Sequence, residues 1–370
     1  MAKRKKISAD LDELMPILIG MWRKMFRLSG PPDELQTREF RAFVNNVKSL
    51  YDLENFQDAL DNRELLGAYL LYFYPLKLQE ALSLMSEVPH HGQKALDISL
   101  APSAYALAAL KYGYTDVTSL GMSEIALKLG AEAAGRTGFP LNVRQTDIGS
   151  LKLLKEKYDL ITISYTLFDL FPANSRDEKE LLLNLNQALT ENGFLIIVES
   201  SIEQINKRFL QMRDMIHQSG LSIQAPCIFK GQCPALAHKN MCFAQRDVEK
   251  PLLISEANRS GKINMNSLKM SYLIIRKHPL EISKELYRVV SPPFDDRERK
   301  TFYLCGTKGS KKLASGLKNH NPDTKAFEYI KRGEAIEIEA SQVEGNTFVL
   351  NEGSKLKVIA SLSKPLQDLC

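Results

Sequence analysis

The sequence predicts an α/β fold built on a class I, Rossmann-like methyltransferase sheet, and two observations carry this prediction. From Gln93 onward, short apolar runs alternate with helix-like segments, an order typical of a parallel sheet with helices on both faces. The first run, KALDIS at 94–99, contains Asp97 and ends in Ser99. Small residues and a helix follow it, as at the first turn of nucleotide-binding sheets.

The composition predicts an ordinary globular protein in a reducing, cytoplasmic setting. Of the 370 residues, 44% are hydrophobic and 25% are charged, and the net charge of +5 allows a nucleic-acid partner without requiring one. No apolar run approaches the roughly 20 residues that span a bilayer, so we expect no membrane anchor. Acidic residues soon after the basic start argue against a signal or transit peptide. Five cysteines are too few, and odd in number, for a disulfide framework.

Three regions are expected along the chain. Residues 1–90 form a helical N-terminal region, in which apolar residues from Phe40 to Tyr51 recur at helical spacing and Pro75 marks a kink or break. Residues 91–310 form the methyltransferase-like domain, with a cysteine-rich insert at 220–265. Residues 311–370 form a small β-rich subdomain containing AIEIEA, NTFVLN and LKVIAS.

The expected strands of the large domain follow in order. After 94–99 and a helix at 103–112 come strands at 116–121, 142–147, 158–165 and 193–200, with helices at 123–135 and 177–190 between them. The runs Met270–His278 and Lys300–Gly306 are expected as two late strands of the same sheet. The basic segment 308–318 is expected to be a loop.

A cofactor turn is expected between the strand at 94–99 and the next helix. S-adenosylmethionine passes so close to the backbone there that glycine is usual, but this chain has Ser99, Ala101 and Ser103 at those positions. The acid that binds the ribose is also missing, because Leu120-Gly121 end the second strand. Together with Asp97, Asp147 after the third strand is a candidate cofactor-binding residue. The alternative is a sheet that keeps its shape and has lost the cofactor.

No catalytic motif supports methyl transfer. The fourth strand ends in Ser-Tyr-Thr-Leu-Phe-Asp, which lacks both the Asn/Asp-Pro-Pro-aromatic pattern of amino-group methylation and a nucleophilic cysteine. Tyr165 and Asp169 could contact a substrate, or they could be a packed aromatic and a helix cap. The catalytic residues therefore stay unassigned.

Four cysteines give the strongest chemical signal: Cys227, Cys233, Cys242 and Cys305. The first three lie on one irregular segment, and their sulfurs can meet Cys305 if the insert folds back over the strand at 300–306. Four thiolates suit zinc or an iron–sulfur cluster, and the absence of C-x₂-C pairs favours the cluster. The alternative is four unrelated buried thiols. His238 is a possible substitute ligand, and Cys370 is expected to be uninvolved.

On these residues the chain resembles the methyltransferase-like assembly factors of the small ribosomal subunit, the Rsm-twenty-two type of mitochondria and bacteria. The resemblance covers RELLGAYLLYFYP, LDIS, YDLITISYTLFDL, VESS, the APC…CP…CFAQR segment, MSYLIIRK, RVVSPP, FYLCG and KAFEYIKRGEAIEIE. It implies a [4Fe–4S] cluster on Cys227, Cys233, Cys242 and Cys305, and a role in maturing the small subunit on its rRNA. The turn at 99–103 departs from the glycines that many relatives keep.

Three hypotheses follow. The first is a cluster-bearing, methyltransferase-fold factor, expected to be monomeric, that binds the small ribosomal subunit through basic segments such as Lys3–Lys6 and Lys308–Lys318. The second is an active S-adenosylmethionine-dependent rRNA methyltransferase. The third is a zinc-stabilised protein-interaction module that does not contact RNA.

Overall fold

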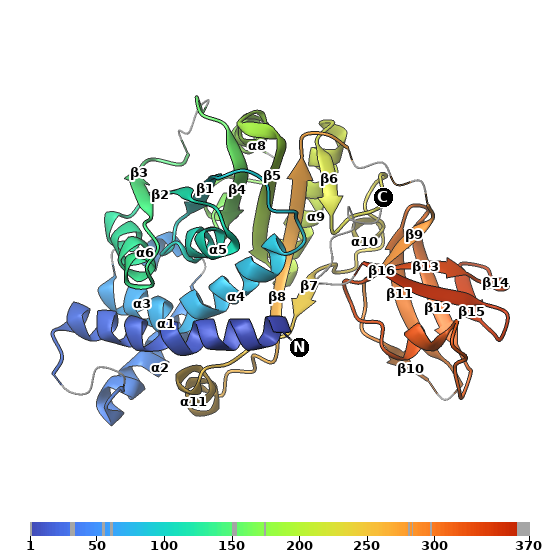
Figure 1. Ribbon diagram of the computed structural model, residues 1–370, viewed down its shortest axis with the longest axis horizontal. Coiled ribbons are helices and arrows are strands. Elements are labelled where there is room, and N and C mark those ends of the chain that lie inside the picture. The colour runs from blue at the N-terminus through green and yellow to red at the C-terminus, as the bar shows by residue number, and fades with distance from the viewer. Residues whose placement is uncertain are drawn as a thin grey trace. The chain divides into compact units, whose positions relative to one another are not determined.

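The computed structural model describes all residues except 1, 30–33, 54–55, 60–61, 150–153, 174, 280–281, 283, 297 and 361–370. The chain, whose elements are labelled in Figure 1, divides into two compact units. Unit 1 comprises residues 1–85, 90–172 and 246–268, and unit 2 comprises residues 86–89, 173–245 and 269–370. Among the described residues, no helix has the length and apolar character needed to cross a membrane.

Helices form the N-terminal part of unit 1, as predicted. They are α1 (Ala2–Phe26), α2 (Thr37–Tyr51), α3 (Arg63–Ala68) and α4 (Tyr74–Met85), with a 3₁₀ turn at Phe56–Ala59 and the later helix α11 (Leu252–Gly261). The apolar face of α2 is buried through Phe43, Val44 and Val47. A π-helical turn, Tyr69–Phe73, joins α3 to α4; of the kink or break predicted at Pro75, the break is absent, because the helix continues through Pro75 after this irregular turn. A π-turn accommodates an extra residue without ending the helix.

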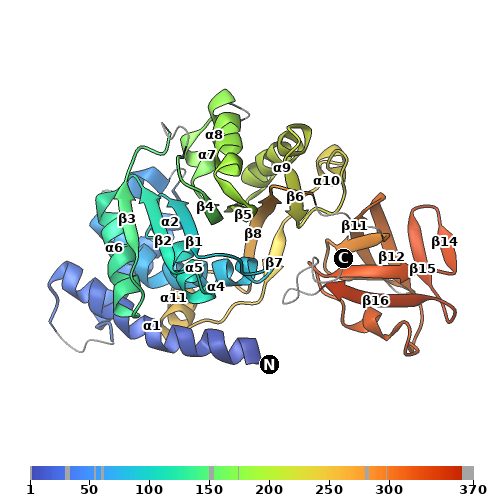
Figure 2. The same cartoon turned by 45° about the horizontal axis from the view of Figure 1, so that its top comes forward.

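Four parallel strands of unit 1 follow the predicted alternation. They are β1 (Lys94–Ser99), β2 (Asp116–Gly121), β3 (Asn142–Gln145) and β4 (Tyr158–Ser164), hydrogen-bonded in the order β3-β2-β1-β4. Helices α5 (Ala104–Tyr112) and α6 (Glu124–Arg136) form the crossovers (Figure 2), and α7 (Leu167–Leu170) follows β4. The register places Ser99 beside Ser164, so the carboxyl ends of β1 and β4 meet at one edge.

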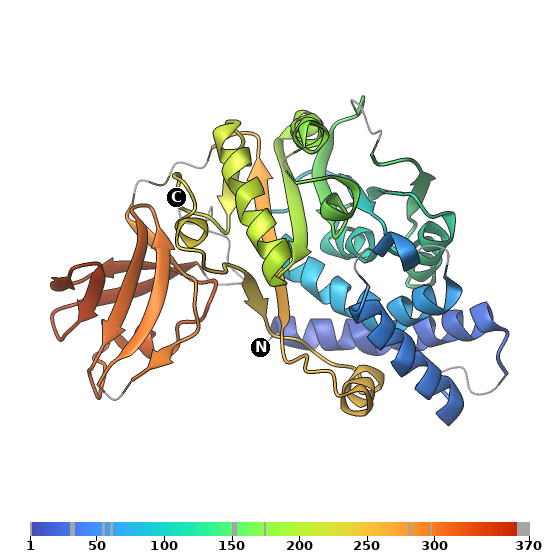
Figure 3. The same cartoon turned by 180° about the vertical axis from the view of Figure 1, so that it is seen from behind.

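Unit 2 contains the strands β5 (Leu189–Ser200), β6 (Ser222–Ala225) and β8 (Leu268–Arg276), with β8 antiparallel between β5 and β6. Helix α8 (Arg176–Gln187) precedes β5, and α9 (Glu203–Gln218) packs on β5 and β6 (Figure 3). The cysteine-bearing segment 226–243 follows β6 and contains only the short helix α10 (Pro234–Ala237). The strand β7 (Ala244–Arg246) comes after it. The fold is therefore α/β with a Rossmann-like methyltransferase sheet, as predicted.

A second sheet occupies the C-terminal part of unit 2. Its strands are β9 (Leu286–Val289), β10 (Phe294–Asp295), β11 (Lys300–Gly306), β12 (Gly309–Ser315), β13 (Ala335–Glu339), β14 (Gln342–Glu344), β15 (Thr347–Leu350) and β16 (Lys355–Ala360). Their order is β14-β15-β12-β11-β9-β13-β16, with β10 beside β11. Phe302, Leu304 and Leu313 point into its core, and the 3₁₀ turn Lys325–Glu328 adds Phe327.

This sheet corrects two sequence predictions. The run 300–306 is not a late strand of the methyltransferase sheet, because β11 pairs with β9, β10 and β12 of the second sheet. The segment 308–318 is not a loop, because β12 runs from Gly309 to Ser315 with Leu313 and Ala314 buried. The predicted domain boundary at residue 311 therefore falls inside β12, and the second sheet already begins at β9.

Candidate functional site

The turn after β1 is packed tightly against neighbouring elements. Ser99, Ala101 and Ser103 are all buried. A Cβ atom at Gly121, the last residue of β2, would lie 2.9 Å from the carbonyl oxygen of Ser99. A Cβ atom at Gly130 in α6 would lie 2.8 Å from the backbone nitrogen of Ser103. The glycines of this region are thus not in the turn but opposite it, where they let β2 and α6 approach the turn closely.

Asp97 is buried beneath this turn and joins three strands. Thr162 on β4 donates a 2.7 Å hydrogen bond to one carboxyl oxygen, and Ser119 on β2 donates a 3.4 Å bond to the other. Burial raises the pKa of Asp97 to about 7, although its hydrogen bonds from Thr162, Ser119 and the backbone of Ala106 oppose that shift. The Ser119 hydroxyl also bonds Ser103. The carboxyl group therefore anchors β1 from within the protein.

The remaining polar groups of the turn also bond one another. The Ser99 hydroxyl donates to the carbonyl of Ala101 at 3.3 Å, and the backbone N–H of Leu100 donates to the Thr166 hydroxyl at 3.2 Å. The four predicted residues Asp97, Ser99, Ala101 and Ser103 thus come together at the end of β1. Asp147 is exposed after β3 and accepts a 3.0 Å bond from the N–H of Gly149.

A buried cluster that the sequence did not predict lies around Glu80 of α4. Tyr105 on α5 donates a 2.8 Å bond to its carboxylate, and Tyr165 after β4 donates bonds of 3.0 Å. The Lys77 ammonium is 3.3 Å from the Glu80 carboxylate and 3.3 Å from the centroid of the Tyr165 ring. Tyr165 adopts a left-handed backbone conformation, with φ of 51°. The sequence signals were Tyr165, named above as a candidate substrate contact, and a Lys–Glu pair three residues apart on a largely apolar helix.

This cluster lies at the carboxyl end of β4. In open α/β sheets, ligands bind outside the carboxyl ends of the strands. Here α4 places a charged, hydrogen-bonded group against the residue that follows β4, and Glu80 is only 1% exposed. Asp169 has a structural partner as well, because it accepts a 3.2 Å bond from the N–H of Phe56.

The four cysteines that were predicted to converge all lie in unit 2. Cys227, Cys233 and Cys242 lie on the segment 226–243, and Cys305 lies on β11. The thiols of Cys227, Cys233, Cys242 and Cys305 lie near one another, since ionisation of one raises the pKa of the next: Cys227 acts on Cys233, both act on Cys242, and all three act on Cys305. Burial, with the neighbouring thiols, raises the pKa of Cys242 to about 12 and also raises the pKa values of Cys233 and Cys305. His238 is exposed after α10, and Cys370 lies outside the described residues.

Helix α9 holds the cysteine segment through side chains two turns apart. Asn206 donates a 2.7 Å bond to the carbonyl of Cys242 and accepts a 3.1 Å bond from its N–H. Asp214 accepts a 3.0 Å bond from the N–H of Cys233. Buried Arg213 donates to the carbonyls of Phe229 and Gly231. Helix α9 therefore holds the cysteine segment both at Cys233 and at Cys242.

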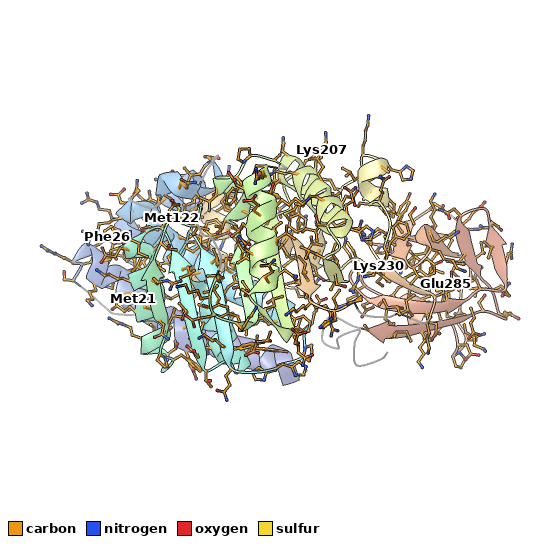
Figure 4. The ribbon with its side chains drawn as sticks, turned by 90° about the horizontal axis from the view of Figure 1, so that it is seen from above. Met21, Phe26, Met122, Lys207, Lys230 and Glu285 are labelled. Carbon is orange, nitrogen blue, oxygen red and sulfur yellow. The ribbon has the colours of Figure 1, made fainter. Side chains whose placement is uncertain are left out.

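Positive side chains surround the four thiols. Arg213 interacts with Cys233, Cys242 and Cys305, Lys230 (Figure 4) interacts with Cys227, and Arg332 interacts with Cys242. Buried Arg288 on β9 lies directly across from Cys305 in the sheet. The Nε–H groups of Arg213 and Arg288 are buried, and neither has a hydrogen-bond acceptor in the structure. Buried guanidinium donors without acceptors are costly, so this environment suits an anionic group.

The thiols do not by themselves form a closed metal-binding group. Across the described residues, no three or more His, Cys, Asp or Glu side chains are arranged to hold a metal ion. The donor set nevertheless fits a thiolate-ligated metal centre chemically, because four sulfur ligands share one environment with the unpaired donors of Arg213 and Arg288.

Comparisons with known proteins place this site in context. The model of the family described as "Mitochondrial small ribosomal subunit Rsm22" matches residues 78–333. No curated protein matches the chain.

Solved methyltransferase structures are similar to this chain at low identity. The glycopeptide N-methyltransferase MtfA is 16% identical, with 34% of this chain and 54% of that chain covered and a TM-score of 0.28. The mitomycin 7-O-methyltransferase MmcR is 15% identical, with 45% of this chain and 52% of that chain covered and a TM-score of 0.34. A SAM-dependent methyltransferase of the DUF858 family from Leishmania major is 17% identical, with 69% of this chain and 89% of that chain covered and a TM-score of 0.41. The chain spans about half the length of the first two.

Proposed function

The chain belongs to the mitochondrial small ribosomal subunit Rsm22 family, and from this premise we propose that it is an assembly or translation factor that binds the immature small ribosomal subunit through its rRNA. Its role is ribosome-related and methyltransferase-like. Under this proposal the methyltransferase-like sheet is a scaffold, the protein acts as a monomer, and its setting is cytoplasmic. The basic segment 308–318 supports an rRNA partner, since phosphates dominate nucleic-acid affinity.

The proposal includes a [4Fe–4S] cluster held by Cys227, Cys233, Cys242 and Cys305. The observation that supports it is that four thiols lie near one another beside the buried Nε–H groups of Arg213 and Arg288, which have no acceptor. When bound, the cluster would supply a covalent cross-link between the cysteine segment and β11. Arg213 and Arg288 would offset its negative charge, and Asn206 and Asp214 would keep the ligand-bearing backbone in place.

The cluster is tested by purifying the protein without oxygen. We expect a brown protein with about four iron and four acid-labile sulfide ions per chain, as four thiolates bind a cubane. Zinc is the alternative metal for the same four sulfurs. Stoichiometric zinc without iron would replace the cluster in the proposal and would support the zinc-stabilised interaction module.

The ribosomal role is tested by sedimentation of the purified, metal-loaded chain with separated ribosomal subunits. We expect it to pellet with small subunits or their precursors, and to be released as salt rises, because phosphate contacts release counterions. Reversing the charge of Lys308, Lys311 and Lys312 should weaken this binding. Sedimentation with large subunits alone, or with neither subunit, would reject the role.

An active S-adenosylmethionine-dependent rRNA methyltransferase is the second candidate. The turn at Ser99, Ala101 and Ser103 disfavours it, because its polar groups bond one another and Gly121 replaces the ribose-binding acid. We propose that S-adenosylmethionine binds weakly or not at all at Asp97, Ser99, Ala101, Ser103 and Asp147. In complementation, Asp97→Ala should then impair subunit assembly less than Cys233→Ser. Micromolar binding by calorimetry, with failed Asp97→Ala complementation, would favour the enzyme.

A further inference from the structure

The second sheet exposes two aromatic side chains beside a lysine. Phe294 on β10 is 52% exposed and Tyr303 on β11 is 43% exposed. Their ring centroids are 5.4 Å apart and the rings are nearly perpendicular. The Lys312 ammonium on β12 lies 5.3 Å from the centroid of the Tyr303 ring. We refer to Phe294, Tyr303 and Lys312 as the aromatic platform.

Strand pairing places the platform on the outer face of the sheet. Tyr303 is directly opposite Lys312, and Phe294 is opposite Thr301, which is two residues from Tyr303 on the same face. The alternate residues Phe302 and Leu304 point into the core. Tyr303 is therefore held in place by a rigid, buried strand rather than by a loop.

Exposed acids, Asp295 and Asp296, follow Phe294, whereas lysines lie at the other end of the platform, on and beside β12. Residues 308–318 contain four lysines and no acid. Lys308 is paired with Glu285 at 2.5 Å (Glu285 is labelled in Figure 4). No carboxylate of the described residues lies within ion-pair distance of Lys312. Its ammonium therefore adds uncompensated positive charge next to an exposed aromatic ring, which suits a ligand that has both phosphates and flat apolar rings.

We propose that the aromatic platform binds single-stranded RNA, with bases stacked on Tyr303 and Phe294 and a phosphate at Lys312. This rests on the proposed function and names the part of the chain that contacts unpaired rRNA. Unpaired bases offer their faces to aromatic side chains, whereas in duplex RNA the faces are stacked on one another. Thr301 and Ser310 add hydroxyl groups on the same face, within a few residues of the rings.

The test is the fluorescence anisotropy of a labelled 12-nucleotide single-stranded RNA and of a duplex of equal length, titrated with the metal-loaded protein. Tyr303→Ala should weaken single-strand binding by about five- to a hundredfold, the range for losing one stacked base. Phe294→Ala should act in the same direction, Tyr303→Phe should bind nearly as tightly, and Lys312→Gln should reduce the salt dependence. Tyr329→Ala is the matched control, because Tyr329 is 59% exposed outside the platform.

The possible outcomes separate this proposal from the ribosomal role. Unchanged RNA affinity in Tyr303→Ala, in a variant with an unaltered circular dichroism spectrum, overturns the platform even if small-subunit sedimentation persists. An equal loss with Tyr329→Ala, or stronger binding to the duplex, also overturns it. If Tyr303→Ala no longer sediments with small subunits but keeps full affinity for the oligonucleotide, the platform is a protein contact instead. If the unsubstituted protein binds the oligonucleotide through the platform but does not sediment with small subunits, only the ribosomal role is rejected.

Discussion

The turn after β1 and the four-cysteine region differ in whether their buried polar groups have hydrogen-bond partners. In the turn, the groups of Asp97, Ser99 and Ser103 all have partners within the protein. In the cysteine region, burial raises the pKa values of Cys233, Cys242 and Cys305, and Arg213 and Arg288 keep buried N–H groups without acceptors. Because unpaired buried donors are costly, the protein's own atoms complete the first region but not the second. The contrast supports the proposal that a bound group completes the cysteine region.

The largest expected effect is the loss of the metal centre. Cys233→Ser and Cys305→Ser should each bleach the anaerobic protein and expose the segment 226–243 to proteases, because metal binding is coupled to local folding. Cys370→Ser is the control and should keep its colour and its protease resistance. Metal content, visible absorption and limited proteolysis measure the result. A fully coloured Cys305→Ser protein would remove that cysteine from the ligand set.

Arg213→Ala should be the next largest effect. It removes the guanidinium from Asp214 and from the carbonyls of Phe229 and Gly231. Breaking a buried ion pair in this way costs about 3–5 kcal/mol in the free energy of unfolding. Lys207→Ala, an exposed position on the same helix, should stay within about 0.5 kcal/mol. Chemical denaturation measures both, and equal effects would mean that Arg213 does not hold the cysteine segment.

A pH-dependent effect should distinguish the turn. The pKa of Asp97 is about 7 in the folded protein and lower when unfolded, so folding binds a proton between those values. The free energy of unfolding should therefore fall as pH rises from about 4 to about 7, by at most about 4 kcal/mol, and the contribution of Asp97 should then level off. Asp97→Asn should flatten this part of the profile. An unchanged slope in urea denaturation would show that Asp97 does not titrate there.

The smallest effect concerns an attempt to restore the ribose-binding acid. Gly121→Asp should lower the free energy of unfolding by about 1–3 kcal/mol, because the new Cβ would lie 2.9 Å from the Ser99 carbonyl oxygen. It should not create measurable S-adenosylmethionine affinity. Gly135→Asp, where no atom lies within 4 Å of the new Cβ and φ is not positive, controls for the charge. Micromolar calorimetric binding by Gly121→Asp would mean that the turn still accepts the cofactor.

The sequence predicted the methyltransferase strands well because their apolar runs alternate with helices. It placed 300–306 in the wrong sheet, because a strand pattern such as KTFYLCG does not identify its neighbours. Lysines in KGSKKLAS concealed the strand β12, whose buried face consists of few apolar residues. The four cysteines were predicted to converge from residue type, with Cys305 on a late strand of the methyltransferase sheet, but Cys305 lies on β11 of the second sheet. The Glu80 cluster was missed because a helical Lys–Glu pair does not reveal its tertiary partners.

The π-helical turn Tyr69–Phe73 sets the rotational phase of the helix that follows it. One residue corresponds to roughly 100° of rotation in an α-helix, so an extra residue accommodated in the turn rotates every side chain of α4 by about that angle relative to an uninterrupted helix. The rotation includes Glu80, which meets Tyr105 and Tyr165 in the phase that the turn provides. A one-residue deletion within 69–73 would therefore turn the carboxylate away from both hydroxyls without altering either tyrosine.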